Sequence, residues 1–219
     1  MNLPNLLTLL RIFFVPLLVA VLVQEDRHWA AFLGLSWPND LVALAIFMAA
    51  ALTDLVDGYL ARRWNQITTV GMLLDPIADK LLISAALISL VQVHRVPGWM
   101  AVLIIGREFA VSGLRSIAAG EGYTIKASEL GKSKMVTQVI AVALILLSGQ
   151  FPLLLAPAEA ALWGTMLFAL VSAADYFLKF WRQVDERIKE RRRIELLRLE
   201  TERQRAAMLA AKRERAMKP

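Results

Sequence analysis

Four aspartates occur as two closely spaced pairs: Asp54 with Asp57, and Asp75 with Asp79. Residues three or four positions apart share one face of a helix, so each pair projects from one helix face. Carboxylates gathered without His or Cys ligands suit hard cations, Mg²⁺ or Mn²⁺. Two such ions would cancel the four charges, and two ions about 3.5–4 Å apart are a recurrent arrangement for displacement at phosphorus.

The residues after the first pair fit a phosphate-containing substrate. Gly58 and Ala61 carry little or no side chain, so a flat base or a diphosphate can approach the helix backbone. Arg62 follows and can bind phosphate oxygens through parallel N–H groups. The alternative is that the aspartates cap helices, as Asp75 before Pro76 would do. Four aspartates on two facing helices cannot all be caps.

Long apolar segments must position these residues. The chain of 219 residues is 58% hydrophobic, against about 45–50% for a soluble domain. A helix needs about 20 mostly apolar residues to cross a bilayer. The sequence therefore predicts an all-α, polytopic membrane protein with six transmembrane helices, preceded by an interfacial helix over 3–10. The six spans are 12–23, 41–60, 72–93, 99–119, 135–148 and 160–181.

The distribution of Lys and Arg predicts the orientation. One set of loops is basic and contains Arg11, Arg62, Arg63, Arg115, Lys126, Lys132, Lys134 and the C-terminal segment. The other set contains only Arg27 and Arg95. We therefore expect both termini and the aspartates on the cytoplasmic side of the cell's inner (plasma) membrane. A cleaved signal peptide is not expected, because the first apolar run ends in 24–27, which is charged.

Charge divides the chain into a membrane domain, 1–181, and a basic, helical cytoplasmic tail, 182–219. The tail holds 13 of the 25 Lys and Arg and 7 of the 19 Asp and Glu, so residues 1–181 are neutral overall. The basic charge therefore does not indicate a nucleic-acid partner. Anionic lipids are the expected partner of the tail, which we regard as accessory, and a coiled-coil partner is the alternative. The absence of Cys excludes disulfides and a Cys nucleophile.

A second cluster of charges follows the fourth span. Arg107 and Arg115 lie eight residues apart, a little over two helical turns, and so share a face. Lys132 and Lys134 come at the start of the fifth span. These four cations suit an anionic acceptor, whose phosphate they would bind, and Glu108 could orient one arginine. The alternative is that the loops are basic for topology alone.

The aspartates belong to a longer pattern, Asp54-x2-Asp57-Gly58-x2-Ala61-Arg62-x8-Gly71-x3-Asp75-x3-Asp79. It resembles the signature of the CDP-alcohol phosphotransferases, with every position filled, and the resemblance extends over 2–181. It implies that an acceptor hydroxyl attacks the phosphorus next to the alcohol of a CDP-linked donor and that CMP leaves.

The resemblance also implies roles for single residues. Asp54, Asp57 and Asp75 match metal ligands, and Asp79 matches a ligand that also acts as general base. The positions that match contacts to the CDP donor are Gly58, Ala61, Arg62 and Thr68, with Asn5 and Thr8 on the nucleotide side.

Other stretches of the chain narrow the resemblance within the family. The segments 2–11, 61–66 and 106–108, together with Gly131 and Lys132, are similar to members that use CDP-diacylglycerol as donor and sn-glycerol 3-phosphate as acceptor. Family members often form homodimers. Two alternatives stay open: another acceptor, such as inositol phosphate, serine or another alcohol, and, from a different class, an ion transporter lined by carboxylates.

Overall fold

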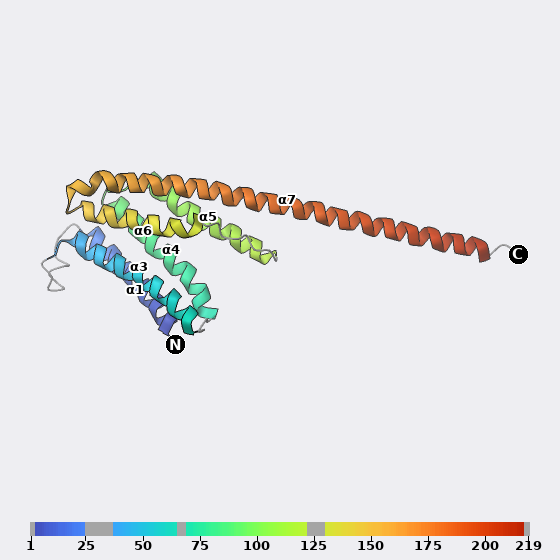
Figure 1. The fold of residues 1–219 in the computed structure, drawn as a ribbon, viewed down its shortest axis with the longest axis horizontal. Coiled ribbons are helices and arrows are strands. Elements are labelled where there is room, and N and C mark those ends of the chain that lie inside the picture. The colour runs from blue at the N-terminus through green and yellow to red at the C-terminus, as the bar shows by residue number, and fades with distance from the viewer. Residues whose placement is uncertain (1–2, 25–36, 65–68, 122–129, 217–219) are drawn as a thin grey trace.

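The computed structural model describes residues 3–24, 37–64, 69–121 and 130–216 (Figure 1). Every regular element in these ranges is helical, which confirms the all-α prediction for this part of the chain. The elements are α1 (Leu3–Val23), α3 (Asn39–Trp64), α4 (Thr69–Gln92), α5 (Gly98–Gly120), α6 (Leu130–Ser148), the short 3-10 helix η1 (Pro152–Leu154) and α7 (Leu155–Ala216).

Each of the six α-helices coincides with one of the predicted spans, and only the span 72–93 passes the end of its helix, by one residue. Within the described residues, two stretches are long and apolar enough to cross a membrane by length and composition, Leu6–Val23 and Pro152–Gln204. The apolar parts of α4 and α6, Lys80–Gln92 and Met135–Ser148, are shorter. Helix α5 carries three charged residues along its length, which lowers its apolar character.

The start of the chain differs from the prediction. Residues 3–10 do not form a separate interfacial helix, because α1 runs without a break from Leu3 to Val23 and Pro16 lies inside it. No Gly or Pro separates Leu10 from Ile12, so nothing in the sequence ends a helix there. Thr8 and Arg11, at 1% and 0% exposure, are buried within the bundle rather than placed at an interface.

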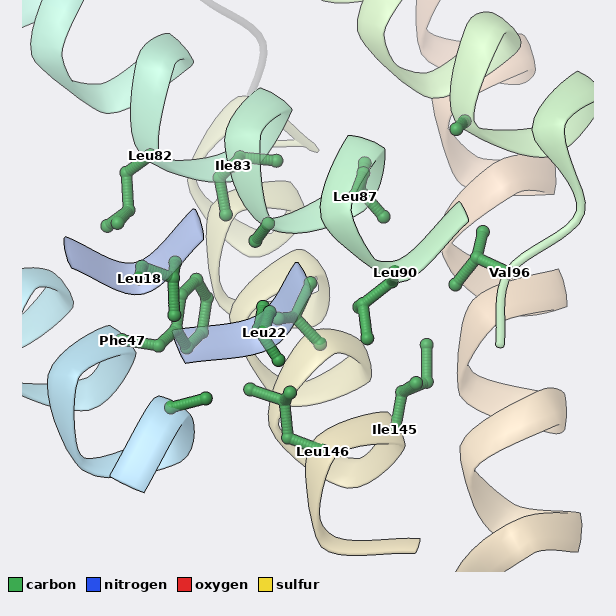
Figure 2. Packing of buried hydrophobic residues seen from close by; sticks show 14 of the residues in the cluster. Leu18, Leu22, Phe47, Leu82, Ile83, Leu87, Leu90, Val96, Ile145 and Leu146 are labelled. Atoms are coloured by element: carbon green, nitrogen blue, oxygen red, sulfur yellow. The ribbon is translucent and has the colours of Figure 1, made fainter. Parts of the chain in front are cut away.

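The helices pack around one apolar core. Helix α1 packs against both α3 and α4, α6 packs against α3 and α7, and α5 packs against α4 and α7. Figure 2 shows this core from close by, with Leu18 and Leu22 of α1 near Phe47 of α3, and with Leu87 of α4 above. Ile145 and Leu146 of α6 close the cluster from below in that view. The core cluster therefore includes residues of all six described α-helices.

The outer surface of the bundle is also apolar. Large apolar side chains that are more than half exposed occur on every long helix, among them Phe13, Leu52, Ile88, Val102, Val136 and Leu167. A soluble protein seldom leaves so much large apolar surface open to water. The bundle is thus apolar inside and outside, which is compatible with a membrane environment.

An ion pair between Arg95 and Asp40 connects the turn after α4 to the start of α3. Helix α4 ends in a Schellman motif, in which the amide of Arg95 donates to the carbonyl of Leu90 at 2.9 Å and His94 takes a left-handed conformation with φ 57°. The guanidinium of Arg95 then contacts both carboxylate oxygens of Asp40, at 2.8 and 3.0 Å. Gln150 donates to the same carboxylate at 3.4 Å. We call this group the Asp40–Arg95 clasp.

The last helix is far longer than the others. Helix α7 has 62 residues, and Figure 1 shows it extending well beyond the rest of the bundle. No Gly or Pro occurs between Trp181 and Ala216, so the predicted tail continues the last span as one helix. Near the bundle, Arg187 donates to the carbonyl of Glu121 at 2.8 Å, at the C-terminal end of α5.

Candidate active site

The aspartate pattern lies on the second half of α3 and the first half of α4. Asp54 and Asp57 are inside α3, and Asp75 and Asp79 are inside α4, which begins six residues before Asp75 at Thr69. Capping residues stand at helix ends, so the capping alternative is excluded for all four. The helical placement of both pairs is therefore confirmed.

Several predicted site residues have side chains outside the described part of the structure. They are Asn5, Asp57, Gly58, Ala61, Arg62, Asp75, Asp79, Lys132 and Lys134, and Thr68 lies outside the described residues altogether. Of these residues only the helical backbone is described, apart from Thr68. The predicted roles of these residues therefore stay predictions.

The first aspartate of the pattern has a buried partner on α1. Nη1 of Arg11 lies 2.9 Å from Oδ1 of Asp54, with side-chain exposures of 0% and 19%. Thr8 is buried one turn earlier on the same helix. Helix α1 thus contributes a cation and a hydroxyl-bearing side chain next to the aspartate pattern.

The sequence analysis missed this role of Arg11 and counted the residue among the loop cations. The structure instead places Arg11 inside α1 and fully buried. The available signal was a single Arg within a long apolar run, since such a charge almost always pairs with another charge inside the bundle. What the sequence did not reveal was which acidic residue would be the partner.

The second predicted cluster is partly described, and it begins with Arg107. This side chain is buried, and Nη1 lies 3.2 Å from Oε1 of Glu108, as the sequence analysis suggested. Nη2 donates to Oγ of Ser172 on α7. Gln138 of α6 donates to the same Glu108 oxygen at 3.3 Å. Helices α5, α6 and α7 therefore meet around one guanidinium.

Arg115 lies two turns further along α5 and is also held by α7. Nη2 donates to the hydroxyl of Tyr176, and the guanidinium carbon sits 4.9 Å from the centre of the Tyr176 ring, within cation–π range. Arg115 is exposed, whereas Tyr176 is buried. Arg107 and Arg115 thus occur on one side of α5, as predicted, and that side faces α7.

The described contacts of Arg107 do not use all of its donors. Its Nε is buried and has no hydrogen-bond partner among the described residues. A guanidinium has five N–H donors, and a buried donor without a partner costs free energy. A buried unsatisfied donor on a cation, with a second arginine two turns along the same helix, is a feature that an anionic ligand would satisfy.

The metal ligands can be assessed only in part. Among the described residues, no group of three or more His, Cys, Asp or Glu side chains is placed to hold an ion. Asp54, which is described, fits a cation: a carboxylate has two oxygens and about four acceptor positions, so contact of one oxygen with Arg11 leaves the group capable of coordination. The all-carboxylate donor set suits Mg²⁺ or Mn²⁺.

Comparison with known proteins defines the class. The CDP-alcohol phosphatidyltransferase family matches residues 1–173, which include the whole aspartate pattern and both arginines of α5. The chain belongs to this family, and it is an enzyme of that type. The match ends within α7, so the extension of α7 beyond the bundle lies outside it.

Individual relatives are similar over most of their length. A Bacillus subtilis protein named CDP-diacylglycerol–glycerol-3-phosphate 3-phosphatidyltransferase is 46% identical over 184 residues, covering 82% of this chain and 95% of the relative. A Mycobacterium tuberculosis protein named probable phosphatidylglycerophosphate synthase is 37% identical over 183 residues, covering 84% and 83%. A Rickettsia felis protein with the same name as the Bacillus one is 34% identical over 179 residues, covering 80% and 93%.

Proposed function

We propose that this protein transfers a phosphatidyl group from CDP-diacylglycerol to a hydroxyl of sn-glycerol 3-phosphate, which gives phosphatidylglycerophosphate and CMP. Family membership supports the chemistry at phosphorus. The names of the relatives support the choice of donor and acceptor. The product lipid belongs to phosphatidylglycerol biosynthesis.

One structural observation favours an acceptor that carries a phosphate. Arg107 is buried with an unpaired Nε among the described residues, and Arg115 follows on the same side of α5. Glu108 supplies one negative charge against these two cations. A neutral alcohol would leave one of the two positive charges without a counter-charge at this site, whereas an acceptor phosphate would neutralise it. Lys132 and Lys134 complete this acceptor site in the proposal.

On the donor side, Asp54, Asp57, Asp75 and Asp79 would hold two Mg²⁺ or Mn²⁺ ions. When bound, the ions would stabilise the charge that develops on the diphosphate as CMP leaves. Asp79 would also accept the proton of the attacking hydroxyl. Gly58, Ala61, Arg62 and Thr68 would contact the CDP group, with Asn5 and Thr8 near the nucleotide.

The proposal includes the placement in the membrane. Six helices span the inner (plasma) membrane, with both termini and the aspartates on the cytoplasmic side and membrane lipids around the bundle. Residues 1–181 form the catalytic domain, 182–219 form an accessory tail, and the protein works as a homodimer. The excess of Lys and Arg in one set of loops and the apolar outer surface support this topology.

An acceptor competition assay tests the function. Purified protein with CDP-diacylglycerol and Mg²⁺ should release CMP when sn-glycerol 3-phosphate is added. Inositol phosphate, serine or glycerol should neither replace it nor compete well.

Arg115→Ala should raise KM for glycerol 3-phosphate by about tenfold, the expected cost of losing one charged hydrogen bond, with little change in KM for the donor. CMP release driven only by another alcohol would overturn the acceptor, and an unchanged acceptor KM would remove Arg115 from the site.

A further inference from the structure

Three hydroxyl-bearing side chains lie on one face of α7. They are Thr165, Ser172 and Tyr176, spaced by seven and four residues, which is two turns and then one turn of helix. All three are buried, with exposures of 3%, 1% and 1%. We call this set the hydroxyl face of α7. Polar groups buried to this extent are expected to have defined partners.

The partners divide the hydroxyl face into two parts. Thr165 donates to the backbone carbonyl of Thr137 on α6 at 3.3 Å, a contact between helices. Ser172 and Tyr176 instead accept hydrogen bonds from Arg107 and Arg115. Two of the three hydroxyls therefore act on the cations that the proposed function assigns to the acceptor phosphate.

We propose that Ser172 and Tyr176 are positioning residues that orient Arg107 and Arg115 toward the acceptor phosphate, and so set the preference for a phosphorylated acceptor. This inference rests on the proposed function. Neither residue stood out in the sequence, since each lies in an apolar stretch. Their assignment comes from the contacts of α7 with α5.

Orientation matters because an arginine side chain has many conformations. Fixing a guanidinium in advance spares its rotamer entropy when the ligand binds. Arg107 is fixed from two sides, by Ser172 and by Glu108, and Glu108 is itself held by Gln138. The long, exposed Arg115 would otherwise extend toward water. Tyr176 restrains it through both its hydroxyl and its ring.

The alternative is that these hydroxyls only join α5 to α7. Thr165 provides the matched control, because Thr165→Val removes a buried hydroxyl from the same face of the same helix without touching an arginine. We compare Ser172→Ala, Tyr176→Phe and Thr165→Val in the full-length protein. The readouts are kcat and KM for glycerol 3-phosphate, KM for CDP-diacylglycerol, and the ratio of activity with glycerol 3-phosphate to activity with glycerol.

Ser172→Ala and Tyr176→Phe should each raise KM for glycerol 3-phosphate by about 2- to 10-fold, the range expected for losing one ordinary hydrogen bond, and Tyr176→Phe should not exceed the effect of Arg115→Ala. KM for the donor should stay within about twofold, and the preference for glycerol 3-phosphate over glycerol should fall. Tyr176→Leu, which also removes the ring from below Arg115, should have a larger effect than Tyr176→Phe. Ser172→Thr, which keeps the hydroxyl, should restore most of the affinity.

The outcome separates the two proposals. If the wild-type protein does not use glycerol 3-phosphate, the proposed function is wrong, and the wild-type assay alone shows this. If the wild type uses it but Ser172→Ala and Tyr176→Phe behave like Thr165→Val, or raise both KM values equally, the positioning role is overturned. An acceptor-specific rise in KM with restoration by Ser172→Thr supports it, since a loss of packing alone would not discriminate between substrates.

Discussion

Helix α3 carries two Arg–Asp ion pairs of nearly equal length in very different settings. In the Asp40–Arg95 clasp the carboxylate is held by both guanidinium nitrogens and by Gln150, and the Arg95 side chain is 32% exposed. In the Arg11–Asp54 pair the Arg is fully buried, and the Asp belongs to the aspartate pattern. The clasp has its partners in place, whereas Asp54 belongs to the sequence pattern of four aspartates for which the proposed function requires further positive charge.

The comparison shows that an ion pair identifies a site only through its neighbours. A buried pair contributes little net stability, because desolvation offsets the attraction between the charges. The clasp joins α3 to the turn between α4 and α5 and so has a structural purpose. Arg11 places one positive charge on Asp54, so in the proposed metal site it would be part of the charge balance.

The largest effect should come from Asp79→Asn. This change keeps the shape of the side chain but removes the base, so turnover should fall by about 10³-fold or more, while much of the donor binding remains. CMP release and binding of CDP-diacylglycerol measure the two quantities separately. Asp175→Asn is the control, because among the described residues Asp175 forms its ion pair with Lys179 of the same helix, away from the aspartate pattern. Turnover within tenfold of wild type would remove Asp79 from catalysis.

The next largest effect is a loss of stability, and it is expected when the two ion pairs are broken one at a time. Arg11→Met leaves Asp54 without its buried counter-charge, a loss of about 3–5 kcal/mol for a broken buried pair. Mg²⁺ or Mn²⁺ should return much of this stability by supplying positive charge to the carboxylates. Arg95→Met removes a partly exposed cation and should cost about 1 kcal/mol, without recovery by metal. Thermal unfolding in detergent with and without the metal measures both.

One result with these two variants would contradict the proposed difference between the two ion pairs. Equal stabilisation of Arg11→Met and Arg95→Met by the divalent ion would show that Asp54 is not distinguished from Asp40. In that case the ion would act elsewhere on the protein, and the proposed metal site would lose Asp54.

A smaller effect is expected at Gly149, which packs against the clasp. A Cβ atom there would lie 2.2 Å from Oδ2 of Asp40 and 2.5 Å from Nη1 of Arg95, too close without movement of the pair. Gly149→Ala should therefore lower the stability by about 1–3 kcal/mol, with unchanged KM values in the folded protein. Gly164→Ala on α7, where a Cβ meets nothing within 4 Å, should not destabilise. A changed acceptor KM in Gly149→Ala would link the clasp to the site.

The sequence predicted the helices well and the contacts between them poorly. The span 41–60 lies inside α3, Asn39–Trp64, and 99–119 lies inside α5, Gly98–Gly120. Apolar composition determines where such helices occur, and so it also predicts their approximate ends. The side chain that pairs with a given charge depends on how the helices pack, and that information is not local in the sequence.

Two examples make this concrete. Arg11 could be expected to need an acidic partner, yet several aspartates were available, and only the packing of α1 on α3 selects Asp54. Tyr176 reads as one more large residue in an apolar helix, and its role follows only from the parallel packing of α7 beside α5. By contrast, the pattern from Asp54 to Asp79 is local, so the placement of both pairs on helices could be predicted from the sequence alone.

The smallest effect should come from shortening α7 beyond its last contact with the bundle. Arg187 donates to the carbonyl of Glu121, and Arg191 lies 3.6 Å from the Glu121 carboxylate, so the contacts described between the tail and α5 end at residue 191. Deleting 192–219 should leave kcat and both KM values within about twofold, as expected for a segment away from packed groups. Deleting 183–219 also removes Arg187 and Arg191, which contact Glu121 at the end of α5. We expect this longer deletion to leave turnover largely intact as well, because the tail is accessory in the proposed function. A large loss of turnover on deleting only 192–219 would instead show that the free part of the helix takes part in the reaction, for example by pairing two copies of the chain.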